Sequence, residues 1–438
     1  MKIHFIGIGG IGISGLAQFM HFQGHKVSGS DIAQTVITKK LTDMGIEVTI
    51  PHSADAIKDQ DLVIHSAIIK PSNPEVIAAK EKGIKVISRK EAIKDILADK
   101  KVYAVAGAHG KSTTTAILAA ILEDSSAIIG AESKAFGSNV RYNQKSDVVV
   151  FEADESDGSF LNANPYCSIV INAEMEHMEF YNYDEELFYS YYKEFINKAK
   201  LRVLNAEDPF LATLEGKIDA IWLSPSKDIK NISYVLRDDE PHTRFELKDL
   251  GFFEVWGFGE HIALDAALAI LAAKEVMDID TIRSNLLKFK GIKKRFDIIT
   301  KEESRVIIDD YGHHPTEIKA TLQSVKEYAK LKGLEKIVAL WQPHKYSRTV
   351  DNIEGFVECF AGVDELVILP VWSAGEEKRE IDFATLFDRY NVTFVEKITQ
   401  TKEGLKLFSA TKELKTLSNG VLVGFGAGDI TYQIRGIQ

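Results

Sequence analysis

Short apolar runs alternate with amphipathic segments of helical length along almost the whole chain. This alternation predicts strands followed by helices, which is typical of α/β folds with parallel sheets. Many apolar runs end in glycine, acidic or histidine residues, as in KIHFIGIGG, VYAVAGAHGKS, DVVVFEADES and RVIIDDYGHH. Because open α/β sheets bind ligands beyond the carboxyl ends of their strands, we expect the functional side chains at these strand ends.

The pattern of a strand, a polar turn and a helix begins anew at three places, and this predicts three domains. We place the first domain at residues 1–97, the second at 98–293 and the third at 294–438. The second boundary falls in the polar stretch FKGIKKRF. A chain of 438 residues has room for roughly two to four domains, so this division is reasonable in size.

The first strand is followed by a GxGxxG loop made by Gly7, Gly9 and Gly12, and Asp31 follows the next strand. In dinucleotide-binding folds such glycines let the backbone approach a diphosphate, and the acid meets a ribose hydroxyl. Taken alone, this domain favours a nicotinamide dehydrogenase. A nucleotide-diphosphate sugar presents the same diphosphate and fits equally well, whereas a tight turn without a ligand fits less well.

A second glycine loop, GAHGKSTTT, follows a strand and opens a helix. In a phosphate loop, backbone N–H groups cradle phosphate oxygens, Lys111 reaches the outer phosphates and the Ser112 hydroxyl ligates Mg²⁺. The loop reads GxxGKS and lacks the earlier glycine of the longer pattern, because position 105 is Val. A kinase or hydrolase needs such a loop and a dehydrogenase does not.

Acidic residues and one histidine follow the next two predicted strands. Four acids, Glu152, Asp154, Glu155 and Asp157, lie at or just after the end of VVVFEADES, and they repel one another unless a cation is present. We therefore favour a metal site here, since a phosphate loop already demands Mg²⁺ nearby, and by pattern we expect Glu152 to point away from the site. His177 ends the following strand in NAEMEH, where it is either a structural histidine or a ligand of a second metal. The alternative is a solvated acidic turn.

The third domain carries two more clusters at strand ends. IIDDYGHH contains Tyr311 and His313, and the following QPHKYSR contains His344, Lys345 and Arg348. A cationic cluster of this kind fits a carboxylate or a phosphate. Surface loops without a ligand are the alternative interpretation.

Composition limits the classes of binding partner and the cellular compartment that we expect for this protein. The net charge of −11 argues against nucleic acid, whose phosphate backbone rewards surplus Lys and Arg. The chain has two cysteines, which favours a reducing, cytoplasmic location, and its first residues do not resemble a signal peptide. We expect no membrane segment, because no apolar run approaches the ~20 residues that span a bilayer.

Together these motifs resemble the Mur ligase family along nearly the whole chain. The residues that carry the resemblance are HFIGIGGIGISGLA with VSGSD, GAHGKSTTT, FEADESDGSFL, NAEMEHM, FKGIKKRFD, IDDYGHHPTEI, QPHKYSRT and GAGDI. The resemblance implies a Rossmann-like UDP-binding domain, a central P-loop ATPase domain and a C-terminal Rossmann-like domain. It also implies a monomer or homodimer that uses ATP and Mg²⁺.

The implied reaction joins L-alanine to UDP-N-acetylmuramate through an acyl phosphate, in the synthesis of peptidoglycan precursors. A sister ligase that adds a preformed peptide or another amino acid is the alternative within the family. Outside it, a nicotinamide dehydrogenase and a non-catalytic nucleotide switch are the competing classes; the phosphate loop argues against the first, and the clustered acids and histidines argue against the second.

The resemblance also assigns residues to tasks. The UDP-sugar site would comprise Gly7, Gly9, Gly10, Ile11, Gly12, Asp31, Ser66 and His109. The ATP site would comprise Ala106, Gly107, Ala108, His109, Gly110, Lys111, Ser112, Thr113, Asp265, Arg295 and Asp310. The amino-acid site would comprise Tyr311, His313, His344, Lys345 and Arg348. The metal ligands would be Ser112 and Glu155 for a first Mg²⁺ and His177 for a second. Lys111 and His313 would be the catalytic residues.

Three positions depart from the family's usual motifs. The adenine motif HNxxN reads His261-Ile262-Ala263-Leu264-Asp265, so the side chain of Ile262 offers no hydrogen bond. Lys345 replaces the arginine of HRYSR, and a lysine is a point charge without a bidentate fork. The motif before His177 reads Glu-Met-Glu where EAD or EPD is usual.

Overall fold

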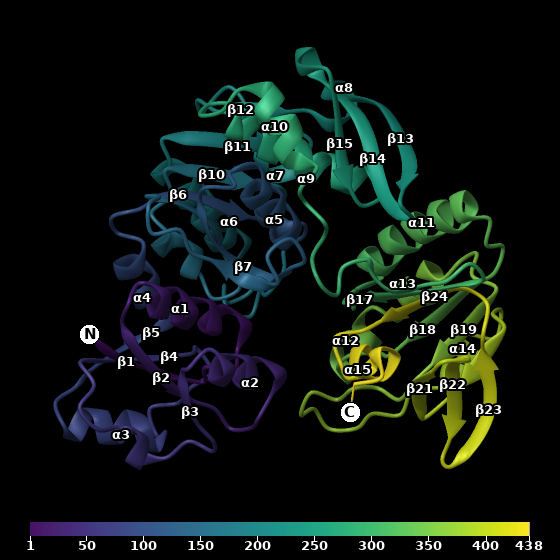
Figure 1. Cartoon of the computed structure of the whole chain (residues 1–438), viewed down its shortest axis with the longest axis horizontal. Coiled ribbons are helices and arrows are strands. Elements are labelled where there is room, and N and C mark those ends of the chain that lie inside the picture. Colours follow the sequence, from purple (N-terminus) through teal and green to yellow (C-terminus); the bar gives the residue numbers. More distant parts are fainter. Residues whose placement is uncertain (438) are drawn as a thin grey trace. The chain divides into compact units, whose positions relative to one another are not determined.

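The computed structural model describes residues 1–437 and groups them into two units (Figure 1). The first unit comprises residues 1–231, 245–253 and 263–290, and the second comprises 232–244, 254–262 and 291–438. Each unit is described by itself below.

The first unit begins with a five-stranded parallel sheet in the order β3-β2-β1-β4-β5. Its strands are β1 (Lys2–Ile6), β2 (Lys26–Ser30), β3 (Glu47–Thr49), β4 (Leu62–His65) and β5 (Lys85–Ser88). Its helices are α1 (Ile11–Phe22), α2 (Val36–Asp43), α3 (Pro74–Glu81) and α4 (Arg89–Ile96), with the short helix η1 (Ala54–Ala56). The strand order reverses between β1 and β4, so the first glycine loop leaves the sheet at its switch point.

A second sheet of the same unit has the order β12-β11-β10-β6-β9-β7-β8, and β8 is its antiparallel edge strand. Its strands are β6 (Lys101–Ala106), β7 (Ser126–Ser133), β8 (Ser138–Arg141), β9 (Val148–Glu152), β10 (Cys167–Val170), β11 (Leu201–Asn205) and β12 (Ile221–Leu223). Around it lie α5 (Lys111–Ile121), η2 (Ser159–Asn162), α6 (Glu185–Lys198), α7 (Pro209–Ala212), α8 (Pro225–Asp228), α9 (Glu260–Ala273) and α10 (Ile279–Leu286). Because β6 lies between β10 and β9, the polar ends of these three strands are neighbours.

One hydrophobic cluster runs through both sheets of this unit, from Ile3 and Leu16 to Phe151 and Phe195. Helix α1 packs on β7 and β8, and Gln18 Nε2 donates a 2.9 Å hydrogen bond to Asn139 Oδ1. The first two predicted domains therefore share a core, although each has its own sheet.

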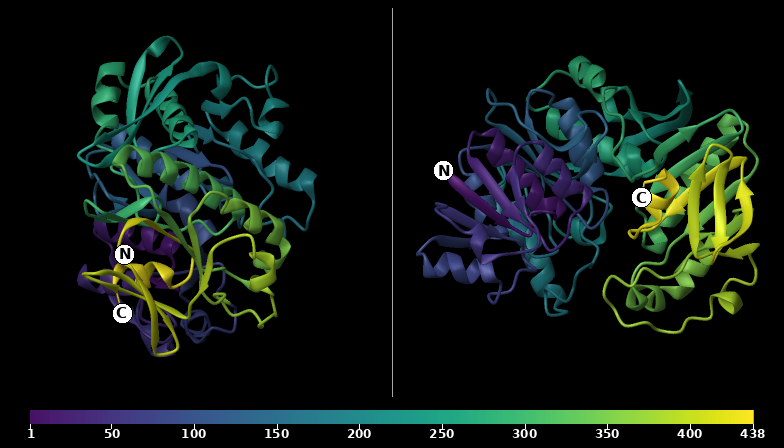
Figure 2. Two further views of the ribbon diagram at one scale, coloured as in Figure 1. Left: turned by 90° about the vertical axis from the view of Figure 1, so that its right-hand side faces the viewer. Right: turned by 60° about the horizontal axis from the view of Figure 1, so that its bottom comes forward.

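The second unit is built on a six-stranded sheet in the order β16-β17-β24-β18-β19-β20, in which β16 is antiparallel to β17. Its strands are β16 (Asp297–Lys301), β17 (Arg305–Asp310), β18 (Ile337–Trp341), β19 (Glu365–Ile368), β20 (Val392–Phe394) and β24 (Gly420–Phe425). Its helices are α11 (Pro315–Lys332), α12 (Tyr346–Asp351), α13 (Ile353–Cys359), α14 (Phe383–Leu386) and α15 (Ile430–Arg435). The antiparallel strands β21 (Lys397–Thr401), β22 (Gly404–Ser409) and β23 (Lys412–Leu417), drawn in yellow, form a small sheet beside it (Figure 2).

A second antiparallel sheet consists of β13 (Ile229–Arg237), β14 (Glu240–Leu247) and β15 (Phe252–Trp256), and η3 (Lys248–Leu250) lies in the connection between β14 and β15. Phe258, just after β15, is buried in the hydrophobic cluster of the second unit, and its ring lies 6.2 Å from that of Tyr328. Residues before the predicted boundary at 293 thus complete the core of the C-terminal unit.

The expected α/β class with parallel sheets is confirmed. The boundaries at residues 97 and 293 stay predictions. Among residues 1–437, no helix combines the length and apolar character needed to cross a bilayer. Cys167 and Cys359 are buried, and each is a free thiol.

Candidate active site

The first glycine loop is held by the neighbouring strand and by Asp31. Backbone N–H groups of Gly7 and Ile8 donate to the carbonyl oxygen of Ser30 at 2.8 and 2.9 Å. Asp31 Oδ2 accepts a 2.8 Å hydrogen bond from the Gly9 N–H, so the acid is directed at the loop. Gly7 has φ = +80°, and a Cβ there would lie 3.2 Å from the Cβ of Ser66, which explains the glycine. The structure brings Asp31 and Ser66 together with the loop, as predicted.

The second glycine loop connects β6 to α5 and carries Lys111 at the first position of that helix. Lys111 Nζ donates to the carbonyl oxygens of Gly107 and Ala108 at 2.6 and 3.2 Å and to Glu155 Oε1 at 2.8 Å. Burial alone would lower the pKa of Lys111, but the nearby carboxylates, above all Glu155, outweigh it and raise that pKa. The N-cap of α5 is Gly110 at φ = +84°, without a side-chain cap, which leaves the first N–H groups of the helix available to a phosphate.

The orientation of Glu152 differs from our expectation. Glu152 Oε1 accepts a 2.9 Å hydrogen bond from Ser112 Oγ, and Oε2 accepts a 2.6 Å bond from the Gly130 N–H. The prediction that Glu152 points away was wrong, because its side chain at the end of β9 faces the adjacent loop and strand. Burial raises the pKa of both Glu152 and Glu155.

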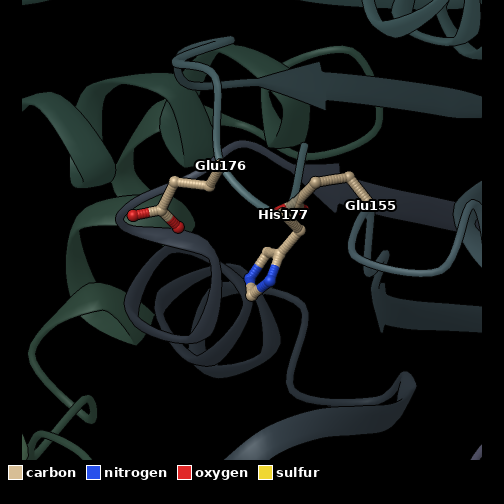
Figure 3. Close-up of side chains that lie close together, drawn as sticks. All are labelled: Glu155, Glu176 and His177. Atoms are coloured by element: carbon tan, nitrogen blue, oxygen red, sulfur yellow. The ribbon is translucent and has the colours of Figure 1, made fainter. Parts of the chain in front are cut away.

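Three of the acidic and histidine side chains come together at the ends of β9 and β10. Glu155, Glu176 and His177 each offer a ligand atom, and these atoms lie within 4.8 Å of one another (Figure 3). Glu155 is 1% exposed, and its Oε2 atom has no hydrogen-bond partner among the described residues. Glu155 and His177, which the resemblance assigns to two different metals, thus lie close together, with Glu176 in addition. Ser112 donates to Glu152 and stands outside this cluster.

His109 of the phosphate loop lies beside the same acids. Its Nε2 atom is 3.4 Å from Glu174 Oε2 and 3.7 Å from Glu176 Oε1. The backbone N–H of His109 donates to Asn172 Oδ1 at 3.1 Å, and Asn172 Nδ2 donates to the His109 carbonyl at 3.2 Å. Asn172 therefore fixes the loop to the end of β10.

A cavity of about 330 Å³ connects the two glycine loops within the first unit. It is lined by Ile11 and Gly12 of the first loop region, by Lys111 and Glu152 of the second, and by Arg89. The Arg89 guanidinium would be 3.1 Å from a Cβ at position 12, and its Nη1 atom lies 3.6 Å from both Asp154 Oδ2 and Asp157 Oδ2. A diphosphate sugar on one loop and a triphosphate on the other could meet here.

In the second unit, the loops after β17 and β18 converge. The rings of Tyr311 and His313 are 5.3 Å apart, and those of His313 and His344 are 5.9 Å apart. Arg348 Nη1 lies 3.0 Å from His344 Nδ1. Burial, reinforced by Arg348, lowers the pKa of His344 to about 4, so its imidazole is neutral and accepts from the guanidinium. Four predicted amino-acid-site residues are thereby gathered in one cluster.

Lys345 stands at the start of α12 in the left-handed region, at φ = +67°. Its N–H donates to the Trp372 carbonyl at 2.8 Å. Ser347 donates to Glu376 from its N–H at 3.0 Å and from its hydroxyl at 2.6 Å. The segment from Trp372 to Glu376 therefore anchors the loop that carries Lys345.

The two predicted ATP-site residues of the third domain, Asp310 and Arg295, have different surroundings. Asp310 is 3% exposed and accepts from the N–H groups of Phe296 and Gly312, both at 2.8 Å. Burial raises the pKa of Asp310 to about 6, although Arg295 opposes this. Arg295 Nη1 lies 3.2 Å from Glu317 Oε1. Asp310 thus holds the backbone at Phe296 and Gly312 in place. Its contact with a nucleotide stays a prediction.

Asp265 and Ile262, the two unusual residues of the adenine motif, are both buried. The Oδ1 atom of Asp265 would be 2.7 Å from a Cβ at Gly110, so Asp265 packs against the phosphate loop. The sequence did not single out Arg89, Asn172 or Glu376 as site residues. Arg89 and Asn172 lie just after β5 and β10, which was the available signal, whereas Glu376 lies in the loop between β19 and α14.

Comparisons with known proteins agree with these motifs. Family models match three segments: "Mur ligase family, catalytic domain" over residues 2–101, "Mur ligase middle domain" over 105–273 and "Mur ligase, glutamate ligase domain" over 294–424. The UDP-N-acetylmuramate–L-alanine ligase of Campylobacter curvus (strain 525.92) is 57% identical over 435 residues, which are 99% of each chain. The ligase of the same name from Helicobacter pylori (strain P12) is 54% identical over 437 residues, covering 99% of this chain and 96% of that one.

The fold also matches a solved structure. The crystal structure of the UDP-N-acetylmuramate-alanine ligase from Thermotoga maritima aligns with a TM-score of 0.83 at 29% identity, covering 99% of this chain and 97% of that one. Family models that span most of the sequence, relatives of more than half identity along its whole length and two glycine loops facing one cavity agree with one another. The chain belongs to the Mur ligase family.

Proposed function

We propose that this protein joins L-alanine to the lactyl carboxylate of UDP-N-acetylmuramate at the expense of ATP. The products are UDP-N-acetylmuramoyl-L-alanine, ADP and phosphate. The observation that carries the proposal is the end-to-end match, at 57% identity, to a ligase named for this reaction. The cavity shared by the two glycine loops supports it, because the reaction needs a diphosphate sugar close to a triphosphate.

The residues around Glu155 fit a divalent cation such as Mg²⁺. One buried carboxylate oxygen of Glu155 has no hydrogen-bond partner within residues 1–437, and Glu176 and His177 offer ligand atoms beside it. We assign Glu155 and His177 as metal ligands, with Ser112 available once its hydroxyl leaves Glu152. Bound there, Mg²⁺ would neutralise phosphate charge as the phosphoryl group moves.

The chain's own groups account for the activation of the carboxylate. Lys111, now paired with Glu155, would turn to the outer phosphates of ATP and stabilise the charge that develops during transfer. The lactyl carboxylate attacks the γ-phosphorus, ADP leaves, and an acyl phosphate forms. Both cysteines are buried, and burial raises the pKa of each thiol, which argues against a cysteine-bound intermediate.

The cluster after β17 and β18 would handle the amino acid. Arg348 and Lys345 carry the positive charge for the alanine carboxylate, and Tyr311 lines the same cluster. Burial lowers the pKa of His313, so its imidazole is neutral near pH 7 and can accept the proton that the attacking amine loses. Phosphate then leaves the acyl carbon, and the amide is complete.

Phosphate release with ATP, Mg²⁺ and UDP-N-acetylmuramate tests the proposal directly. L-Alanine should support turnover, and it should do so better than glycine, L-serine or a preformed peptide. Oxygen-18 in the lactyl carboxylate should appear in inorganic phosphate, because one carboxylate oxygen leaves with the phosphoryl group. Label in AMP would indicate adenylate activation, and peptide-dependent turnover would indicate a sister ligase; either result would refute the proposal.

A further inference from the structure

Tyr181 connects the two segments that supply the metal-ligand candidates. Its side chain is 0% exposed, and its hydroxyl donates a 2.5 Å hydrogen bond to the backbone carbonyl of Glu155. Glu155 lies in the turn after β9, whereas Tyr181 lies in the segment between β10 and α6, four residues after His177. One side chain thus joins the turn of the first ligand to the segment of the other two.

The segment that carries Glu176 and His177 has an unfavourable backbone that needs support. His177, Asn182 and Tyr183 have φ of 54°, 54° and 56°, in the left-handed region that residues with a Cβ avoid. Such conformations persist only where the surroundings over-determine them. A phenol ring and hydroxyl buried at position 181, within this strained stretch, supply that constraint.

Aromatic packing fixes the ring of Tyr181. Its centroid lies 4.9 Å from those of Phe180 and Phe188 and 5.3 Å from that of Tyr191. Phe180 and Tyr191 also close over Gly158 of the acidic turn, where a Cβ would meet them at 2.8 to 2.9 Å. The turn and the segment are therefore packed against each other beside the metal-ligand candidates.

We propose that Tyr181 is a positioning residue that sets the distance between Glu155 and the pair Glu176 and His177, and thereby the affinity of the site for a divalent cation. The proposal rests on the metal assigned under the proposed function. Tyr181 does not ligate the cation, because its hydroxyl is directed at the Glu155 carbonyl. That carbonyl also accepts from the Gly158 N–H at 3.0 Å, so it keeps one partner when the phenol is lost.

Tyr192 offers a matched control. It too is 0% exposed and belongs to the same aromatic cluster, but its hydroxyl has no hydrogen-bond partner among the described residues. Tyr181→Phe and Tyr192→Phe each remove one buried oxygen and keep the ring. The two variants differ in that Tyr181→Phe alone breaks the link to Glu155.

The experiment measures Mn²⁺ binding to the full-length protein by electron paramagnetic resonance, without substrates. Tyr181→Phe should weaken Mn²⁺ binding about tenfold, as loss of a group that orients a ligand does. In turnover, its half-saturating Mg²⁺ should rise by a similar factor, and saturating Mg²⁺ should restore kcat. Tyr192→Phe should match the wild type in both measurements.

Unchanged Mn²⁺ affinity in Tyr181→Phe would overturn the proposal, as would equal weakening in both variants or a wild type that binds no Mn²⁺. Failure of the proposed function would look different. The wild type would then bind Mn²⁺, and Tyr181→Phe would weaken that binding, while L-alanine supported no phosphate release.

Discussion

Lys111 and Glu155 are in contact although the sequence assigns them to different ligands, a phosphate and a metal. Their side chains are 16% and 1% exposed and their charged atoms are 2.8 Å apart. A buried charge without a partner is unfavourable. While no ligand is bound, each of the two residues therefore compensates the charge of the other. Under the proposed function, binding of ATP and a cation would separate them.

The two glutamates of the acidic turn should respond differently to the same substitution. Glu155→Gln removes a charge from the metal-ligand candidates, so half-saturating Mg²⁺ should rise about tenfold or more. Glu152→Gln disturbs the bonds to Ser112 and Gly130, so the KM for ATP should rise while the Mg²⁺ requirement changes less. Initial rates measured across Mg²⁺ and ATP concentrations separate the two effects. A larger Mg²⁺ effect for Glu152→Gln would exchange the roles assigned to them.

Lys345 tests the departure from the usual arginine. If its ammonium holds the alanine carboxylate, Lys345→Ala should raise the KM for L-alanine about tenfold, which corresponds to about 1.4 kcal/mol, and leave the KM for ATP nearly unchanged. Lys345→Arg should keep or improve alanine binding, because a guanidinium can form two parallel hydrogen bonds. Steady-state kinetics with each substrate varied provide the measurement. An unaltered KM in Lys345→Ala would mean that Arg348 and His344 suffice.

Residue identity was predictable from spacing, whereas side-chain direction was not always. Strand ends with Gly-Lys-Ser or Glu-x-x-Glu patterns are visible in one sequence, and Lys111, Glu155 and His177 do gather in the first unit. The direction of Glu152 depends on Gly130, which lies in a strand 22 residues away. No sequence motif marks Tyr181, because its hydroxyl bonds to a backbone carbonyl, which every residue type has.

At the scale of elements, two loops of the second unit share one electrostatic environment. They leave β17 and β18, which both pair with β24 in the sheet. His344 lies between His313 and Arg348, and its neutral form is favoured by burial and by the guanidinium. The loops therefore resist protonation in the folded protein.

This environment predicts how stability depends on pH. His344 has a pKa near 6.5 when unfolded and about 4 when folded, so between these values the unfolded chain binds the extra proton. Stability attributable to His344 is thus present above pH 6.5 and is lost as the pH falls toward 4. Asp310 acts in the opposite sense, because its folded pKa of about 6 exceeds the unfolded value.

Comparison of His344→Gln with the wild type isolates the histidine contribution, because Asp310 is common to both. Relative to the wild type, the variant should gain stability as the pH is lowered from 6.5 toward 4. Denaturant unfolding at several pH values in this window gives the two curves. Curves that stay parallel would contradict the assignment of a depressed pKa to His344.

Parallel strands and their following helices were predictable, and the antiparallel sheets were less so. Apolar runs such as those of β1, β6 and β18 are buried on both faces and read clearly in the sequence. The sheets β13-β14-β15 and β21-β22-β23 consist of partly exposed strands with many charged residues, as in KELKTL of β23. Their pairing depends on turn geometry, and local hydrophobicity does not encode it.

At the scale of the molecule, the two units do not coincide with the three sequence segments. The cluster that links Leu16 with Phe151 joins the first two segments into one unit. Residues 232–244 and 254–262 belong to the C-terminal unit although they precede its predicted start. Sequence motifs mark where a nucleotide-binding pattern begins, but residues on either side of that point can belong to the same hydrophobic core.

Phe258 provides a test of this division. Phe258→Ala should destabilise the C-terminal unit by about 3–5 kcal/mol, the usual cost of emptying a buried phenylalanine site. Phe252→Ala in the same hairpin region should cost far less, because Phe252 is 60% exposed. Hydrogen exchange across residues 306–341 reads the local effect. Loss of protection confined to residues before 293 would show that Phe258 supports the other unit.

Each unit contains one buried thiol whose rate of alkylation reports how fast that unit opens. Cys167 lies in β10 of the first unit and Cys359 at the end of α13 in the second. A thiolate reacts with an alkylating reagent, and burial keeps both sulfurs protonated and shielded. Each sulfur becomes labelled at the rate at which its own half of the chain opens. Mass spectrometry of the two cysteine-bearing peptides would therefore measure the opening rates of both units in one experiment, without an engineered probe.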